Sequence, residues 1–261
     1  RDQKVIGWHR QKCTGEFESV AVLPTANGPD AVYVSIKLTI NSATVRYICK
    51  LDNREWGTNH ATEYNGLDYY YTENKAVSSH SVAFSSNELA HFANTTVKVT
   101  VNGVLQTGTH TVDADGNLTI STIKDVSGGN LADGTYKIVI GIAYTGILAP
   151  LYLNETGREG TSSGSKLSAP KAFIRFKDTV GKANSVTTST KAGQLSSGTY
   201  GPASKNVLEN IKFTSSGSVT ETTEAYLVNA PEYLQTIFIV NDTPTPCTVL
   251  SMTPQLYVGD L

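Results

Sequence analysis

Apolar and polar side chains alternate over short runs along most of the chain. In Ala31–Ile40, for example, an apolar side chain stands at every second position, which is the period of a strand with one buried face. The runs are rich in Val, Ile, Thr and Tyr, which are typical of strands. We therefore predict a mainly β fold. The predicted strands lie at residues 17–23, 31–40, 45–51, 96–101, 118–123, 136–144, 172–176, 207–213 and 237–240.

Turn residues separate these runs at the spacing of hairpins. Asn102-Gly103 and Asp115-Gly116 are pairs that supply the positive φ angles of tight turns. Residues 27–30, Asn-Gly-Pro-Asp, predict a longer turn. Only residues 86–94 carry a helical pattern, and it predicts a single turn or two.

Composition changes twice along the chain, and the changes predict three parts. Residues 1–58 contain closely spaced predicted strands, and residues 59–150 are predicted to form hairpins that end in an apolar stretch. Residues 151–261 are predicted to form a C-terminal β domain with long loops. Between residues 154 and 205, Gly, Ser, Thr, Lys and Ala dominate, so large apolar side chains are too few to pack a core. We expect a neighbouring subunit to order these loops, because long polar loops in a β protein usually serve contacts.

The charge balance narrows the classes of function. Charged residues make up 17% of the 261 residues, and 23 acidic against 21 basic side chains leave a formal charge of −2. No basic excess exists to displace counterions from phosphates, which argues against a free-standing nucleic-acid-binding protein. The most apolar stretch, residues 138–153, is interrupted by Gly141, Gly146 and Pro150, so no stable membrane insertion is predicted.

The cysteines are few and isolated. Cys13, Cys49 and Cys247 form no pair with the spacing of a zinc site and are odd in number, so neither zinc nor a disulfide framework is indicated. We expect them to stay reduced. The single methionine is Met252 and the first residues contain no apolar signal-peptide core, so we expect a piece of a longer protein.

Candidate catalytic and metal-binding groups are sparse. The chain contains no nucleotide-binding glycine loop, HExxH or GxSxG motif, and its five histidines are isolated. We predict no enzyme activity and no cofactor. Asp113 and Asp115, in the run DADGN, could offer oxygen ligands to calcium, but the later bidentate acid of a calcium loop is missing. A hairpin turn is the favoured interpretation.

Two further groups carry weaker hypotheses. Glu16 and Glu18 lie on the same face of a strand, so they could come close enough to serve glycoside hydrolysis, although a solvated strand edge is favoured. The tyrosine run 69–71 is either a platform for a sugar or a partner or an ordinary strand with its middle residue inward. Trp8 and Trp56 are interpreted as core anchors rather than ligand contacts.

Five basic residues lie close together in the last part of the chain. On one subunit they would form an ordinary solvated surface. Repeated around a ring, they could line a passage with positive charge or pair with acids of a neighbour. These candidate channel or subunit-contact residues are Lys166, Lys171, Arg175, Lys177 and Lys182.

The order of several segments resembles a known family. The series begins with VIGWHRQ, GEFESVAVLP, DAVYVSIKLTIN and VRYICKLD, continues with ELAHFANTTVKVTVNG, DADGN and IVIGIAYTGILAPL, and ends with DTPTPCTVLSMTPQLYVGDL. It resembles the tail nozzle proteins of short-tailed bacteriophages, also called tail tubular protein B or stabilisation proteins. The resemblance covers nearly the whole chain, although the loops between 154 and 205 match only in position and character.

The resemblance implies a structural virion protein of the phage tail. Six copies would form a tube below the portal and an adaptor ring, the tube would conduct genomic DNA non-specifically during ejection, and its outer face would dock fibres or spikes. Residues 1–58 would be closing strands of a larger, propeller-like β domain completed by a missing N-terminal part of the nozzle. Residues 59–150 would then form a small β-sandwich or barrel, followed by the C-terminal β domain at 151–261.

Two alternatives stay open. A tail-associated carbohydrate-binding protein or depolymerase would use Glu16, Glu18 and the tyrosine run in a cleft. A secreted adhesin of stacked β-sandwiches would carry glycans on the sequons at Asn94 and Asn117, which are common by chance in chains rich in Asn and Thr. Assembly state separates these hypotheses, because only the nozzle subunit is expected to form rings.

Overall fold

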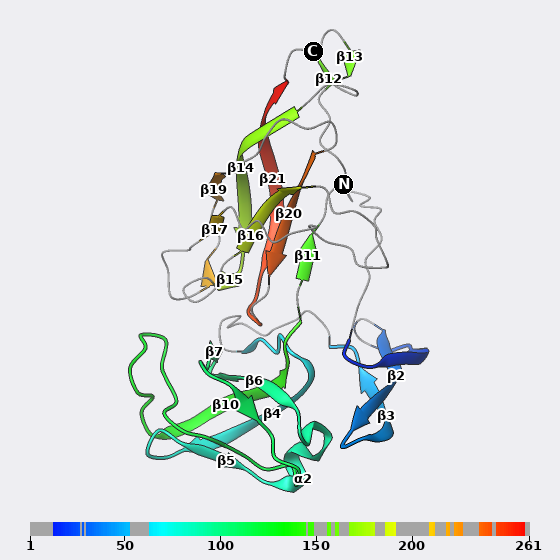
Figure 1. The fold of residues 1–261 in the computed structure, drawn as a ribbon, viewed down its shortest axis with the longest axis vertical. Coiled ribbons are helices and arrows are strands. Elements are labelled where there is room, and N and C mark those ends of the chain that lie inside the picture. Colours follow the sequence, from blue (N-terminus) through cyan, green and yellow to red (C-terminus); the bar gives the residue numbers. More distant parts are fainter. Residues whose placement is uncertain are drawn as a thin grey trace. The chain divides into compact units, whose positions relative to one another are not determined.

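The fold is built from antiparallel strands, drawn as arrows in Figure 1. A computed structural model describes residues 13–26, 28, 30–52, 63–144, 146–148, 156–157, 160–161, 167–180, 186–191, 209–211, 218–219, 222–226, 235–241 and 244–258. The chain divides into two compact units. The first consists of residues 1–55, 83–96 and 111–118, and the second of residues 56–82, 97–110 and 119–261.

Three strands of the first unit form a sheet with β2 (Ala31–Ile40) between β1 (Glu16–Leu23) and β3 (Ala43–Lys50). The alternation in β2 places Val34 and Ile36 on one face, where both are buried. Every residue of β1, by contrast, is exposed. The sheet therefore has a partly covered apolar face and an edge strand that is open to solvent.

The middle of the chain forms a second sheet in the order β4-β10-β6-β7, with β8 also paired to β6. Ile138 and Ile140 of β10 and Val99 of β6 are fully buried in it. The turn between β6 and β7 has positive φ at Asn102 and Gly103, which confirms the predicted hairpin. The strands are β4 (Asp68–Val77), β6 (Thr96–Val101), β7 (Val104–Leu105), β8 (His110–Thr111) and β10 (Gly134–Ile142), and a separate pair joins β5 (Val82–Phe84) to β9 (Leu118–Ile120).

A short helical segment follows β5. It consists of α2 (Ser86–Leu89) and the 3-10 helix η1 (Ala90–Phe92), as the pattern at 86–94 predicts. The backbone N–H of Ser85 donates to Glu88 Oε2 at 2.6 Å, which satisfies one of the free N–H groups at the helix start. Leu89 and Phe92 are buried, so packing rather than length holds this segment helical.

The last part of the chain contains two larger sheets. One has the order β11-β20-β16-β17 and the other the order β19-β14-β21. Two short pairs accompany them, β12 (Thr156–Gly157) with β13 (Gly160–Thr161) and β15 (Thr179–Val180) with β18 (Ser218–Val219). The strands of the two sheets are β11 (Gly146–Leu148), β14 (Leu167–Lys177), β16 (Val186–Lys191), β17 (Glu209–Ile211), β19 (Thr222–Tyr226), β20 (Gln235–Asn241) and β21 (Thr248–Val258).

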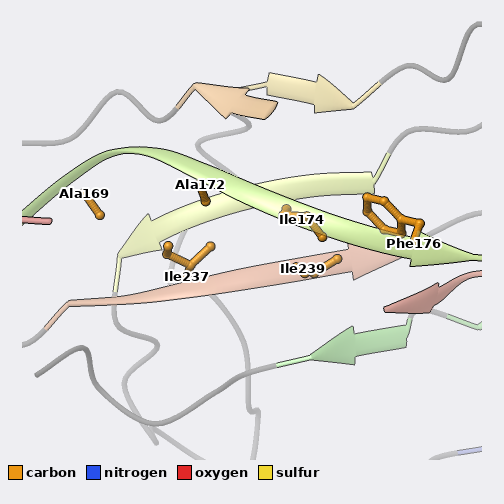
Figure 2. Close-up of a cluster of buried hydrophobic side chains, with 6 residues drawn as sticks. All are labelled: Ala169, Ala172, Ile174, Phe176, Ile237 and Ile239. Carbon is orange, nitrogen blue, oxygen red and sulfur yellow. The ribbon is translucent and has the colours of Figure 1, made fainter. Parts of the chain in front are cut away.

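The hydrophobic core of this part lies between β14 and β20. Figure 2 shows the buried side chains that β14 and β20 contribute to this core. Partly buried apolar side chains that include Val249 and Met252 of β21 pack against the cluster. Each fully buried Ile or Phe contributes roughly 1.5–3 kcal/mol of transfer free energy. The cluster consists of Ala169, Ala172, Ile174, Phe176, Ile237 and Ile239.

The prediction of a mainly β fold is confirmed. The described sheets are antiparallel, and none of them closes on itself. The boundaries 1–58, 59–150 and 151–261 and the propeller-like completion of the first part stay predictions. Most of the polar region between 154 and 205 lies outside the described residues.

Candidate functional site

Three of the five candidate basic residues share one face of β14. Lys171, Arg175 and Lys177 alternate there with the buried Ala172 and Phe176, because successive side chains of a strand point to opposite faces. The outward row of β14, defined here as Lys171, Phe173, Arg175 and Lys177, is thus fixed by the packing of the inward row. Lys166 and Lys182 lie outside the described residues.

Acids neutralise part of the positive charge of this row. Lys171 Nζ lies 2.6 Å from Glu224 Oε2 of the neighbouring β19 and 5.0 Å from the ring centroid of Phe173. Lys177 Nζ lies 3.7 Å from Asp178 Oδ2. Arg175 is exposed and forms no ion pair among the described residues. The row therefore carries about one net positive charge, too little for strong retention of a polyanion.

Several other residues on this sheet face are polar and uncharged. Register places Thr222 of β19 and Ser251 of β21 on either side of Arg175, and Thr253 and Gln255 follow along β21 as exposed residues. Hydroxyls and an amide can donate and accept hydrogen bonds but supply no activated nucleophile or acid pair. The outward row can make contacts, and its described groups supply no catalytic pair.

The carboxylate of Asp113, a candidate calcium ligand, accepts hydrogen bonds from its own turn. Asp113 Oδ1 accepts hydrogen bonds from the backbone N–H groups of Asp115 at 3.0 Å and Asn117 at 2.7 Å. These bonds lower the pKa of the Asp113 carboxyl, the one from Asn117 most. Among the residues that the structure describes, no group of three His, Cys, Asp or Glu side chains could hold a metal ion.

Glu16 and Glu18 form ion pairs with different cations. Glu16 Oε2 lies 3.0 Å from Lys37 Nζ, and Arg46 donates to both carboxylate oxygens of Glu18, at 2.8 and 3.1 Å. A register irregularity between Phe17 and Ser19 interrupts the pairing of β1 at Glu18. The hydrogen bond from Arg46 lowers the pKa of Glu18, so this carboxyl is a poor proton donor for glycoside hydrolysis.

The tyrosine run does not continue a regular strand. The register of β4 against β10 shifts between Tyr71 and Asp68, and Tyr69 adopts a φ of 53°. Tyr71 donates through its hydroxyl to Glu73 at 2.9 Å. All three tyrosines are partly buried, so the expected alternation of one inward and two outward rings is not found. The two tryptophans, Trp8 and Trp56, lie outside the described residues.

The amide nitrogens of both sequons are engaged in hydrogen bonds. Asn94 Nδ2 donates to Asn41 Oδ1, and Asn117 Nδ2 donates to Asp113 Oδ2 at 3.0 Å. A glycan on either nitrogen would replace one of its two hydrogens and would have to fit beside these contacts. The adhesin hypothesis gains no support from these two positions.

Sequence reasoning missed the carboxyl of Asp68. This residue begins β4 and is partly buried, and its carboxyl forms no hydrogen bond or ion pair with other described residues. Burial raises its pKa to about 6. An acid at the start of a strand carries no sequence signal of its own, because burial here depends on the neighbouring strand β10.

The three cysteines are free thiols in the structure. Burial raises the pKa of Cys247 to about 11. Burial, with a smaller repulsion from Cys13, also raises the pKa of Cys49. Raised pKa values keep these two thiols protonated and unreactive near neutral pH.

No protein-family model matches the chain, and no curated protein matches it. No helix within the described part of the chain is long and apolar enough to cross a membrane.

Proposed function

We propose that the chain is a structural subunit of a phage tail nozzle, a six-fold tube that conducts genomic DNA during ejection and docks fibres or spikes. The observation that carries the proposal is the exposed apolar surface of the sheet β1-β2-β3 along β1, where Phe17, Val20 and Val22 face solvent. Monomeric proteins rarely leave such surface open, whereas subunits of an assembly cover it with a neighbour.

The charge distribution supports the DNA-conducting role. A conduit must let DNA pass, and each phosphate neutralised by a fixed cation strengthens retention. The chain has a formal charge of −2, and the outward row of β14 keeps Lys171 and Lys177 next to acids. The segment series described above, from VIGWHRQ to the C-terminal DTPTPC run, supports the assignment to this family.

The proposal requires self-assembly and weak DNA binding. Sedimentation velocity should show a species of six copies of the 28.0 kDa chain, and a mobility-shift titration at physiological salt should show no stable complex with duplex DNA. A protein that stays monomeric at every concentration, or that binds duplex DNA tightly, would contradict the proposal.

A further inference from the structure

Among the residues that the structure describes, no further strand pairs with either edge of the sheet β1-β2-β3. β1 and β3 are its outermost strands, and their central side chains are strongly exposed, Val20 to 67% and Ile48 to 82%. An edge strand presents a row of backbone N–H and C=O groups that can pair with a further strand. The side chains at the centre of both edges are apolar. No charge at these positions opposes pairing with a further strand.

The two edges carry opposite charges. The charged residues of β1 are both acidic, Glu16 and Glu18, whereas those of β3 are both basic, Arg46 and Lys50. Glu16 and Arg46 already bind cation and acid partners within the sheet, yet their side chains stay 73% and 61% exposed. Each can therefore meet a second, oppositely charged partner at the edge.

Register places the charges where a continued sheet would need them. Glu16 pairs with Lys37, and Lys37 pairs with Arg46, so the three residues form one row across the sheet. Because β1 and β3 are each antiparallel to β2, they run parallel to each other. A neighbouring copy related by rotation about an axis along the strands would place its β1 parallel to β3, with its Glu16 beside Arg46.

We propose that β3 of one copy pairs with β1 of the next copy, so that the sheet continues from subunit to subunit. The occupant of each open edge is thus a second copy of this chain, bound head to tail. Such a heterologous contact forms a ring when the rotation between copies closes. The inference refines the proposed function, on which it rests for the closed ring.

The opposite charges favour this arrangement over pairing of β1 with β1. In an antiparallel β1–β1 contact, Glu16 and Glu18 would lie opposite the apolar end of the partner strand around Val22, and the basic edge would have no role. Head-to-tail pairing places Glu16 of one copy beside Arg46 of the next, so that one acid meets one base at each contact. Substitutions in β3 should weaken the head-to-tail contact and leave a β1–β1 contact unchanged.

Two complementary variants test the inference. Glu16→Lys with Glu18→Lys makes both edges basic, and Arg46→Glu with Lys50→Glu makes both edges acidic. Each variant alone should associate at least about tenfold more weakly than the natural chain by sedimentation velocity, because like charges meet at each contact. An equimolar mixture should assemble again, with the two variants alternating.

Ile48→Lys guards against variants that fail to fold. Its side chain is already 82% exposed, so the substitution should leave the circular dichroism spectrum and the melting temperature unchanged while placing a charge at the centre of the β3 edge. Loss of assembly in this variant supports the inference. Val126→Lys, at another exposed apolar position, is the matched control and should assemble normally.

The outcomes separate the inference from the proposed function. If the natural chain assembles and the edge variants assemble equally well, or the mixture stays dissociated, the edge contact is wrong while the tube stays possible. If Arg46→Glu with Lys50→Glu and Ile48→Lys both assemble as well as the natural chain, β3 takes no part in the contact and the head-to-tail arrangement is wrong. If the natural chain never assembles, both proposals are overturned.

Discussion

At the residue scale, the least expected site is the start of β4. Tyr69 and Tyr70 lie opposite the single residue Gly141, which forms a bulge, and Tyr69 takes a left-handed φ of 53°. Asp68 lies next to this bulge and its carboxyl is partly buried. Burial raises the pKa of this carboxyl to about 6. Bulges and left-handed non-glycine residues cost free energy, so the surrounding packing must hold them.

Asp68→Asn should stabilise the fold at pH 7 by about 1 kcal/mol after allowance for solvent screening. The folded-state pKa of about 6 lies above the ordinary value of 3.8, so the natural carboxyl stabilises the fold only when protonated, and this contribution is lost as the pH rises through 6. The advantage of Asn should therefore shrink as the pH falls from 7 to 4. Urea unfolding at several pH values measures it.

Asp113→Asn is the control with the opposite sign. Hydrogen bonds from its own turn lower the pKa of Asp113, so this carboxylate stabilises the fold above its ordinary pKa and loses that effect as the pH falls. The variant should be less stable than the natural chain at pH 7, with a difference that narrows in acid. Parallel pH profiles for the two variants would contradict the assigned environments.

Gly141→Ala should destabilise the protein by about 2 kcal/mol. A Cβ at this position would lie 2.7 Å from Leu67 Cβ and 2.8 Å from the backbone oxygen of Asp68, and that backbone oxygen has little room to move. Gly146→Ala is the matched control, since its nearest neighbour would lie 3.8 Å away. Thermal unfolding of both variants tests the bulge, and equal melting temperatures would count against it.

At the element scale, β14 organises the C-terminal part of the chain. It pairs with both β19 and β21, sends one row of side chains into the core, and presents Lys171, Arg175 and Lys177 on the other face. The positions of the basic residues are thus a consequence of which residues the core requires.

Phe176→Ala should cost about 3–5 kcal/mol, because it removes a fully buried ring from this core. Phe173→Ala, on the same strand but with a ring that is 37% exposed, should cost less than about half as much. Denaturant unfolding followed by circular dichroism measures both. Similar losses for the two variants would mean that β14 faces the core differently from Figure 2.

Much of this organisation is predictable from the period of the sequence. Alternation identifies β2 and the centre of β14, and Asn102-Gly103 identifies the hairpin between β6 and β7. The ion pair of Lys171 with Glu224 is not predictable, because it depends on which distant strand pairs with β14. The bulge at Tyr69 is also hidden, since three consecutive tyrosines carry no period that tells inward from outward.

At the scale of the whole molecule, charge and exposed apolar surface point toward assembly. The chain is close to neutral, several of its described cations lie beside acids, and one of its sheets ends in edges of opposite charge. A subunit of a DNA-conducting tube needs these properties together: strong contacts with its neighbours and weak contacts with the DNA that passes.

Cryo-electron microscopy of the purified chain, and of particles that contain it, tests the central claim most directly. The account predicts a six-fold ring with an open central passage, located in virions at the tail below the adaptor ring. A monomer, or an isolated trimer bound to a glycan, would contradict it.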